Sequence, residues 1–168
     1  MALASGCEEH VWPWGAGLVL RRGWPLVAAW PGMPIEMIEG ESGVPSDDLL
    51  AARVLVFNVR RGAPPGFTPV YVGRSMPGFA GSVLGNPFRV GHSRARGEAV
   101  AAYLPWLRAK FTQDGAEREA LIDLARRVNA EERTLLGCWC SPLACHADHV
   151  RTAVLGCAIW LRSQERDG

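Results

Sequence analysis

The chain has 168 residues, a formal net charge of +1 and five cysteines. This length suits one domain with a hydrophobic core plus an extension, and it is too short for two full domains. Near-neutral charge gives no support of its own for a nucleic-acid binder, and an odd number of cysteines without a recognisable secretory signal favours a reducing cytoplasm over a disulfide framework.

The first fifty residues form a stretch rich in tryptophan and proline, with Arg21 and Arg22 interrupting its apolar runs. Neither run reaches the roughly 20 residues that a membrane-spanning helix requires, so we expect no membrane anchor here. A hairpin, an arm that contacts a protein partner or a second copy, and a poorly structured leader remain open. We divide the chain into an extension at 1–50, an α/β domain at 51–163 and a polar tail at 164–168.

Regular elements are expected from residue 54 onward. Short β-rich runs at 54–59 and 69–73 predict strands, separated by a Pro/Gly turn. An apolar stripe predicts a helix over 93–111, with Ser93 as its cap and Pro105 producing a kink or a break. Further patterns predict a helix at 117–128, a strand at 134–140 and a helix at 147–161. Strands that alternate with helices favour an α/β domain with a largely parallel sheet.

Three of the five cysteines and two of the four histidines lie within twelve residues, from 138 to 149. Thiolate sulfur and imidazole nitrogen are the ligand types that zinc prefers, and this run offers five ligands where a closed site needs four. The spacing is compact but differs from standard zinc-finger spacings. Two of the cysteines should share one face of the strand, with Trp139 on the other. The candidate metal ligands are Cys138, Cys140, Cys145, His146 and His149.

Three interpretations of this cluster are open. The first is a metal site. The second is a metal-free site in which Cys145, at a helix N-terminus that lowers its pKa, is the nucleophile and His146 or His149 is its base. The third is purely structural, with buried cysteines acting as small apolar residues. Cys7 and Cys157 are isolated and are expected to be tail and core residues.

Several motifs agree, in order, with one known family. They are Tyr71–Arg74, Leu84–Phe88, Val90–Gly91, Arg96, Glu98–Val100, Trp106–Leu107 and Cys138–Asp148. Over residues 54–156 the chain resembles the uncharacterised family called domain of unknown function 4326. That resemblance implies a small Rossmann-like, three-layer fold whose signatures are the Leu84–Phe88 loop and the cysteine segment. The family is common in bacteriophages and bacteria, which favours a nucleobase, nucleotide or modified nucleic acid as substrate. The N-terminal extension and Pro105 depart from the family pattern, and His149 lies where the resemblance is weakest.

Gly73-Arg74 and the segment from Cys138 to His146 both follow predicted strands, so we expect them to face one crevice at the carboxyl ends of those strands. Arg74 suits a phosphate or carboxylate, with a surface salt bridge as the alternative. Asn86 suits a nucleobase edge, or else it organises its own loop. Arg94 and Arg96, at a helix start, attract an anion or form a solvated basic face. The predicted substrate-binding residues are Arg74, Gly85, Asn86, Pro87, Phe88, Arg94 and Arg96.

These observations predict an enzyme that hydrolyses or transfers a group on a nucleobase, nucleotide or modified nucleic acid, with zinc as the candidate cofactor. Four protein ligands would close the metal site and make it structural, whereas three would leave a position for chemistry. A zinc deaminase is disfavoured because its motifs are missing. One alternative is a non-catalytic zinc-stabilised module that binds nucleic acid or protein, and another is a metal-free cysteine-dependent transferase or hydrolase. The predicted catalytic residues are Cys145, His146, Asp148 and Asn86.

Overall fold

The computed structural model describes residues 47–166, so that most of the predicted extension, including Cys7 and its tryptophans, lies outside the described residues. Strands and helices alternate along this part of the chain. The elements are α1 (Asp47–Arg53), β1 (Val54–Asn58), the 3-10 helix η2 (Val59–Arg61), β2 (Thr68–Tyr71), α2 (Arg96–Phe111), α3 (Ala116–Asn129), β3 (Thr134–Cys138) and α4 (His146–Arg166).

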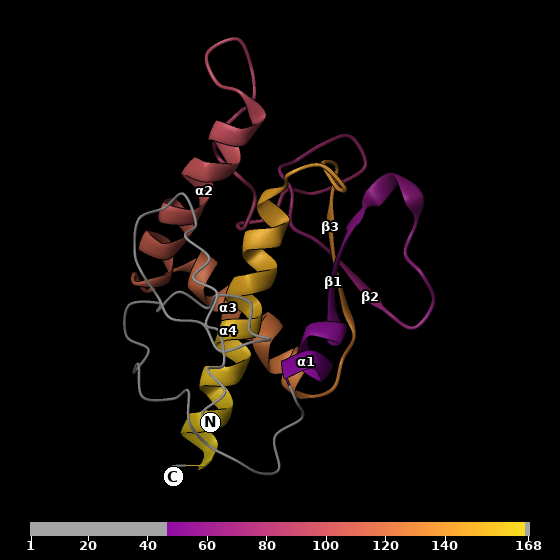
Figure 1. The fold of residues 1–168 in the computed structure, drawn as a ribbon, viewed down its shortest axis with the longest axis vertical. Helices are drawn as coiled ribbons and strands as arrows, with labels where there is room; N and C mark the ends of the chain where they lie inside the picture. The colour runs from indigo at the N-terminus through magenta and orange to yellow at the C-terminus, as the bar shows by residue number, and fades with distance from the viewer. Residues whose placement is uncertain (1–46, 167–168) are drawn as a thin grey trace, which may run out of the picture.

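The strands form a parallel sheet in the order β1-β3-β2 (Figure 1). The central strand β3 is buried along its whole length, and its first residue, Thr134, pairs with both Val54 and Thr68. Because all three strands run the same way, their carboxyl ends meet at one edge of the sheet. We call this edge, with the loops that follow Asn58, Tyr71 and Cys138, the carboxyl edge, and the opposite one the amino edge. The predicted α/β class and parallel sheet are confirmed.

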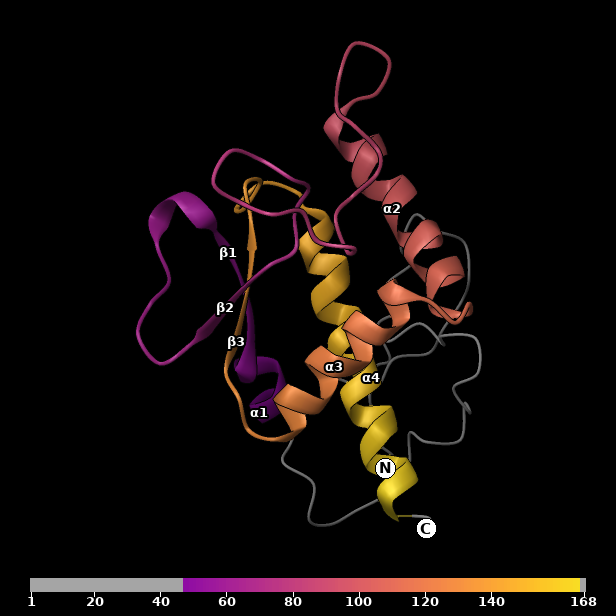
Figure 2. The same ribbon diagram turned by 180° about the vertical axis from the view of Figure 1, so that it is seen from behind.

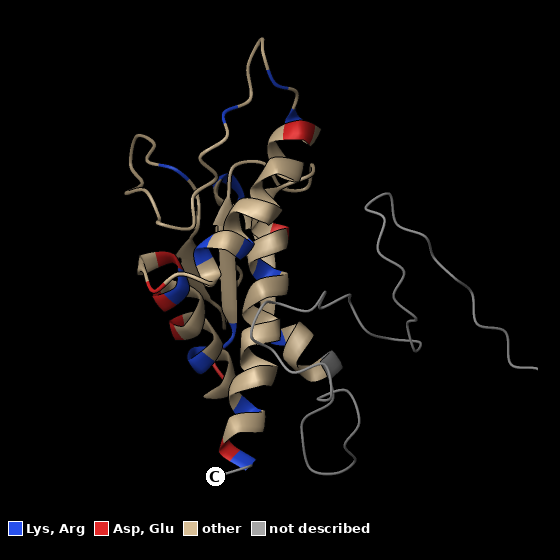
Figure 3. Cartoon of the chain, turned by 90° about the vertical axis from the view of Figure 1, so that its left-hand side faces the viewer, with Lys and Arg blue, Asp and Glu red and all other residues tan. Residues whose placement is uncertain are grey.

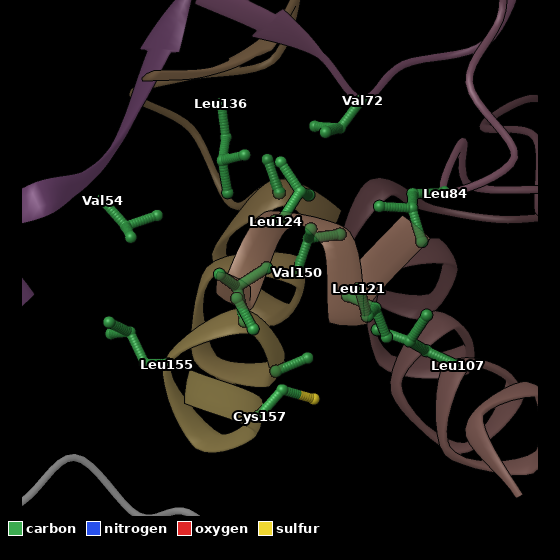
Figure 4. Packing of buried hydrophobic residues seen from close by; sticks show 14 of the residues in the cluster. Val54, Val72, Leu84, Leu107, Leu121, Leu124, Leu136, Val150, Leu155 and Cys157 are labelled. Atoms are coloured by element: carbon green, nitrogen blue, oxygen red, sulfur yellow. The ribbon is translucent and has the colours of Figure 1, made fainter. Parts of the chain in front are cut away.

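Helices α2, α3 and α4 lie on one side of the sheet (Figures 1 and 2). The second helical layer of a three-layer arrangement is not among residues 47–166. The core fills the space between the sheet and this helical layer (Figure 4), and it includes the predicted core residue Cys157, which is fully buried. Large, fully buried side chains from strands, loops and helices make up this core: Leu50, Val54, Val72, Leu84, Tyr103, Leu107, Leu121, Leu136, Val150 and Val154.

Helix α2 differs from its prediction at its start and in its middle. It begins at Arg96 rather than Ser93, because Gly91 and Arg94 pair their backbones in a tight turn first. The predicted Ser93 cap is therefore wrong: Ala95 is the cap residue, and its N–H donates to the Glu98 carboxylate at 2.9 Å. Of the two outcomes predicted at Pro105, a break is ruled out, since the helix continues through this exposed residue to Phe111, and a kink stays a prediction.

The ends of the domain also differ from the predicted boundaries. Helix α1 crosses position 50, and Leu50 is buried in the core, so the packed domain starts before residue 51. Helix α4 continues to Arg166 and takes in most of the predicted polar tail. No helix in the described part of the chain combines the length and apolar content needed to cross a membrane.

Candidate functional site

The carboxyl end of the central strand places the cysteine cluster. Strand β3 ends at Cys138, two residues earlier than predicted, so that Cys140 lies in the loop that follows it. Cys145 directly precedes α4 and acts as its cap, since its sulfur accepts the Ala147 N–H at 3.4 Å. One turn of chain between a strand end and a helix start thus brings three thiols together, as the spacing in the sequence suggested.

The sulfur atoms of Cys138, Cys140 and Cys145 all lie within 4.8 Å of one another. Cys138 and Cys145 are buried, whereas Cys140 is partly exposed. Ligand atoms around a tetrahedral zinc ion are separated by roughly 3.5–3.8 Å, so these thiols are already close to the spacing of a metal site. The three cysteines can therefore hold a metal ion.

His146 is oriented toward the same cluster. Its Nε2 lies 2.8 Å from the carbonyl oxygen of Val72, just after β2, and its Nδ1 lies 3.8 Å from the Cys138 sulfur and 3.9 Å from the Cys145 sulfur. A carbonyl only accepts, so Nε2 carries a proton, and Nδ1 is the ring nitrogen that faces the two sulfurs. Backbone carbonyls orient metal-bound histidines in this way. His146 thus suits a fourth ligand.

The three thiols differ in how readily they lose a proton. Hydrogen bonding from Cys145, then from His146, lowers the pKa of Cys138 to about 4 against the opposing effect of burial. The same hydrogen bond, together with burial, raises the pKa of Cys145. Burial, then the charge on Cys138, raises the pKa of Cys140. The lowered pKa predicted for Cys145 was therefore wrong: the first thiolate of this coupled cluster is Cys138, and it makes a second one costly.

The loop that contains Cys140 is held by a residue that sequence reasoning missed, Asn58. Its side-chain amide donates to the carbonyls of Trp139 at 3.0 Å and Ser141 at 2.8 Å, and its oxygen accepts the Arg60 N–H at 3.0 Å. Asn58 is the last residue of β1, directly opposite Cys138 on β3. The available signal in the sequence was this asparagine, a polar residue near the end of the apolar run predicted as a strand at 54–59. The peptide bond between Ser141 and Pro142, in the same loop, is cis.

A pocket of about 190 Å³ adjoins the cluster. Both family signatures contribute to its wall, so the predicted common crevice is confirmed. Asn86 comes from the first signature and Cys138, Cys140 and His146 from the second, and Arg74 lines the pocket beside them. The remaining lining residues come mainly from the strand ends, the 73–90 loop and α2: Tyr71, Gly73, Met76, Phe88, Val90, Arg96, Ala99, Val100, Trp139 and Ala144.

The Leu84–Phe88 loop contributes to the pocket wall, and hydrogen bonds connect it to α2 and to Arg74. Asn86 is buried; its amide donates to the Ala99 carbonyl at 3.0 Å, and its oxygen accepts the Phe88 N–H at 2.8 Å. Arg74 donates to the carbonyls of Asn86 at 3.1 Å and Phe88 at 3.4 Å, not to a carboxylate. These contacts give Asn86 and Arg74 the role of organising the loop, and a direct role toward substrate stays a prediction.

Gly85 explains how the loop approaches the strand so closely. A Cβ atom at this position would lie 2.9 Å from the Ser82 carbonyl, 3.0 Å from the Gly73 carbonyl and 3.1 Å from the Arg74 nitrogen. These are backbone atoms, so a larger residue would have to push the strand end and the loop apart. The neighbouring Pro87 is exposed and does not line the pocket.

Arginines and aromatic rings surround the pocket mouth. Arg96 lines the pocket beside Cys140, where its charge and a hydrogen bond oppose the rise in the pKa of that thiol. Arg94 does not line the pocket, but its guanidinium lies 5.0 Å from the centre of the Phe88 ring. The predicted basic helix start is therefore present, divided between one arginine inside the pocket and one at its rim.

On α4, two further predicted residues lie outside the site. Asp148 is exposed in the first turn of α4 and does not line the pocket. His149 lies outside the three-thiol group and stacks on Tyr103, with ring centres 6.4 Å apart. Burial lowers the pKa of His149. Asp148, two residues after His146, projects from a different side of α4, whereas His149, three residues after it, shares the face of His146 and packs, like it, against Tyr103.

Aromatic residues that the sequence did not single out support the site. The Trp139 Nε1 donates to the Tyr71 hydroxyl at 3.0 Å, and that hydroxyl donates to the Arg74 carbonyl at 2.7 Å. Tyr103 is fully buried, donates to the Leu84 carbonyl at 2.7 Å and contacts the edge of the His146 ring. Burial raises the pKa of both tyrosines, so each hydroxyl keeps its proton.

Comparison with known proteins identifies a family but no activity. The sequence profile described as "Domain of unknown function (DUF4326)" matches residues 59–156, which is more than half of the chain. No curated protein matches, and no solved structure does. The matched segment contains β2, α2, α3, β3, the pocket and the three-thiol group.

Proposed function

The chain belongs to the DUF4326 family, and on that premise we propose that its domain is a zinc-stabilised module that binds a nucleobase or nucleotide in the pocket beside the metal. One observation has the greatest weight: three sulfurs lie within 4.8 Å of one another, and a histidine nitrogen with a fixed orientation lies 3.8–3.9 Å from two of them.

Zinc is the metal that this ligand set favours. Three thiolates and one imidazole form a common tetrahedral zinc environment, and softer sulfur ligands select against magnesium and calcium. Bound there, zinc supplies a cross-link and a positive charge that offsets the thiolates. Cys138 holds the end of β3, Cys145 holds the start of α4, and His146 connects the cluster to the end of β2 through Val72.

The pocket wall supports the ligand class. Tyr71, Phe88 and Trp139 offer aromatic faces on which a planar base can stack, and Arg96 offers a charge-assisted donor for an anionic group. Met76 and Val90 add an apolar surface to the same wall. A flat, partly polar ring with an attached phosphate matches these three kinds of contact.

A catalytic function is the second candidate, and one observation favours it. Cys138, Cys140 and His146 all line the pocket, so a metal ion held by the cysteines is reachable from it. If His146 does not ligate, the fourth position is open to water, and hydrolysis or group transfer on the bound nucleotide becomes feasible. The metal-free alternative makes Cys145 the nucleophile, although that thiol is buried and its pKa is raised.

The proposal is tested by metal analysis joined to ligand binding. Protein purified without added metal or a histidine tag is analysed by inductively coupled plasma mass spectrometry, and then titrated calorimetrically with the four nucleoside 5′-monophosphates. Cys138→Ser and His146→Ala are expected to lose zinc. Cys157→Ser is the matched control, because Cys157 is a buried thiol in α4 outside the cluster.

Near-stoichiometric zinc in the parent and the control, with binding of at least one nucleotide, supports the proposal. Incubation of the same samples with the nucleotides, followed by chromatography, separates binding from turnover. Zinc loss in Cys138→Ser but not in His146→Ala would favour the open, catalytic site. A folded, metal-free parent would overturn the zinc proposal and leave the metal-free cysteine chemistry to be tested by alkylation of the thiols.

A further inference from the structure

We propose that the ligand of this pocket is a single base of a single-stranded nucleic acid whose backbone lies across the arginines of the carboxyl edge. This inference rests on the proposed function and specifies its ligand class. It follows from three observations on the described residues: unpaired charge at one edge, aromatic rings placed beside that charge, and a pocket too small for a larger ligand.

The charge observation is the strongest. Between Asn58 and Glu98 the chain has six arginines and a single acidic residue, Glu98, which is engaged with the Ala95 backbone. None of the six forms an ion pair with the described residues, although four other basic residues do. We call these six the arginine rim: Arg60, Arg61, Arg74, Arg89, Arg94 and Arg96.

The rim is confined to one end of the molecule. Figure 3 shows basic segments on the loops at the upper end, whereas basic and acidic segments are mixed on the helices below. Arg60 and Arg61 follow β1, and Arg89, Arg94 and Arg96 follow the pocket loop. Basic side chains that lack acidic partners, gathered on one edge, create a field that attracts a polyanion with several phosphates.

Two aromatic side chains lie beside the rim. The Arg60 guanidinium is 4.9 Å from the centre of the Trp139 ring, and the Arg94 guanidinium is 5.0 Å from that of Phe88. Both rings also line the pocket. Alternation of guanidinium groups and aromatic faces is how proteins bind unpaired strands, because bases stack on the rings while phosphates contact the arginines.

The pocket volume favours a single base within a strand over a whole free nucleotide as the ligand. Its volume is about 190 Å³, whereas pockets that enclose whole drug-sized ligands begin near 300 Å³. The volume suits one ring system, so that the sugar and phosphates of the ligand would lie outside it, over the rim. A free monophosphate uses only a small part of that rim. A base in a duplex is stacked and paired, so it would have to be flipped out first.

The test measures fluorescence anisotropy of labelled ten-nucleotide strands with the zinc-loaded full chain. The probes are oligothymidylate, oligouridylate and a duplex of the same length. Contact with about four phosphates predicts a slope near −3 in log K against log salt, or roughly 50-fold weaker strand binding between about 50 and 200 mM salt. Both strands are expected to bind more tightly than the duplex and than thymidine monophosphate, which is the competitor.

A matched pair of triple variants tests whether the rim itself is responsible. Arg60→Gln/Arg61→Gln/Arg89→Gln removes three rim charges, and Arg126→Gln/Arg133→Gln/Arg166→Gln removes three charges from residues outside the rim. The rim variant is expected to weaken strand binding at least tenfold and to flatten the salt slope, with unchanged zinc content. The control variant should bind strands nearly as well as the parent.

Distinct results overturn the two proposals. Equal competition by monophosphate and strand, or equal losses in the two triple variants, would sink the strand inference while leaving nucleotide binding in place. Absence of zinc, or of any nucleotide binding, would instead sink the proposed function. Preference for one of the two strands supports the inference, whereas tighter binding of the duplex would contradict it.

Discussion

Charged residues form ion pairs at the amino edge of the sheet, whereas the rim arginines at the carboxyl edge form none with the described residues. At the amino edge, Arg127 and Glu132 close the turn from α3 to β3 with two hydrogen bonds, of 2.9 and 2.6 Å, and Arg53 pairs with Glu131. Arg151 is satisfied by the backbone carbonyls of Val54 and Ala51, where α1 meets β1. This edge uses its charges to hold the chain together.

The carboxyl edge instead leaves its charges available. The arginine rim has no acidic partner among the described residues, three thiols converge without a disulfide, and a pocket adjoins them. Like charges gathered in this way repel one another, although Arg74 also donates to the carbonyls of Asn86 and Phe88. The comparison shows that charged residues close the chain at the amino edge, and it fits our proposal that the carboxyl edge is the binding edge.

Removing the metal should have the largest effect on stability, and the loss of protection should be confined to the carboxyl edge. Chelation of the zinc-loaded protein at neutral pH is expected to lower the unfolding midpoint by about 10 °C or more, because metal binding stabilises the folded state directly. In native-state hydrogen exchange, amides of residues 139–147 should lose protection while those of the α3–β3 turn keep it. Uniform loss across both edges would contradict the proposed division.

Filling the space at Gly85 should damage the carboxyl edge by itself. Gly85→Ala places a methyl group about 3 Å from three backbone atoms, so we expect a loss of about 1–3 kcal/mol in the free energy of unfolding and weaker nucleotide binding. Gly97→Ala is the matched control, since a Cβ there meets nothing within 4 Å. It should be neutral or stabilise the domain by up to about 1 kcal/mol. Urea unfolding measures both, and equal effects would rule out the steric explanation.

Asn58 and Asn129 provide a paired test of the two regions. Asn58→Ala removes both bonds that hold the cysteine loop and should cost about 1–3 kcal/mol, together with a measurable loss of zinc affinity. Asn129→Ala removes one bond, from its amide to the Ala158 carbonyl between α3 and α4, and should cost about 1 kcal/mol. Competition with a zinc indicator reports affinity. If Asn129→Ala weakened zinc binding equally, the local role of Asn58 would be refuted.

The smallest effect concerns the amino edge and has a definite pH dependence. Hydrogen bonding from Arg127 lowers the pKa of Glu132 to about 2, below its unfolded value of about 4.3. The ion pair therefore stabilises the fold above the unfolded pKa, and this contribution is lost as the pH falls through 4 toward 2. Glu132→Gln should cost up to about 1 kcal/mol at neutral pH and almost nothing near pH 2. Urea unfolding of both proteins cancels the pH dependence that they share, and a constant difference would contradict this assignment.

The sequence by itself determined the elements and the cluster. Period-two and helical apolar patterns depend on neighbours within one turn, which is why β1, β2, α3 and the start of α4 were predicted within a few residues. The density of cysteine and histidine in residues 138–149 marked the site, because three thiols so close in sequence need only one turn of chain to meet. The family was also evident from ordered motifs within residues 59–156.

Only the tertiary structure decided the roles within the site. Asn58 ends β1 and Val72 directly follows β2, yet they fix the cysteine loop and the His146 ring, and no local pattern encodes such distant pairings. Packing against α2 and its own loop engages the Asn86 amide, and neighbouring sulfur moves the lowered pKa from Cys145 to Cys138. Tertiary packing likewise determines which arginines form ion pairs with carboxylates. The sequence therefore supplied the residue types of the site, and the meeting of three parallel strand ends determined which of them face one another.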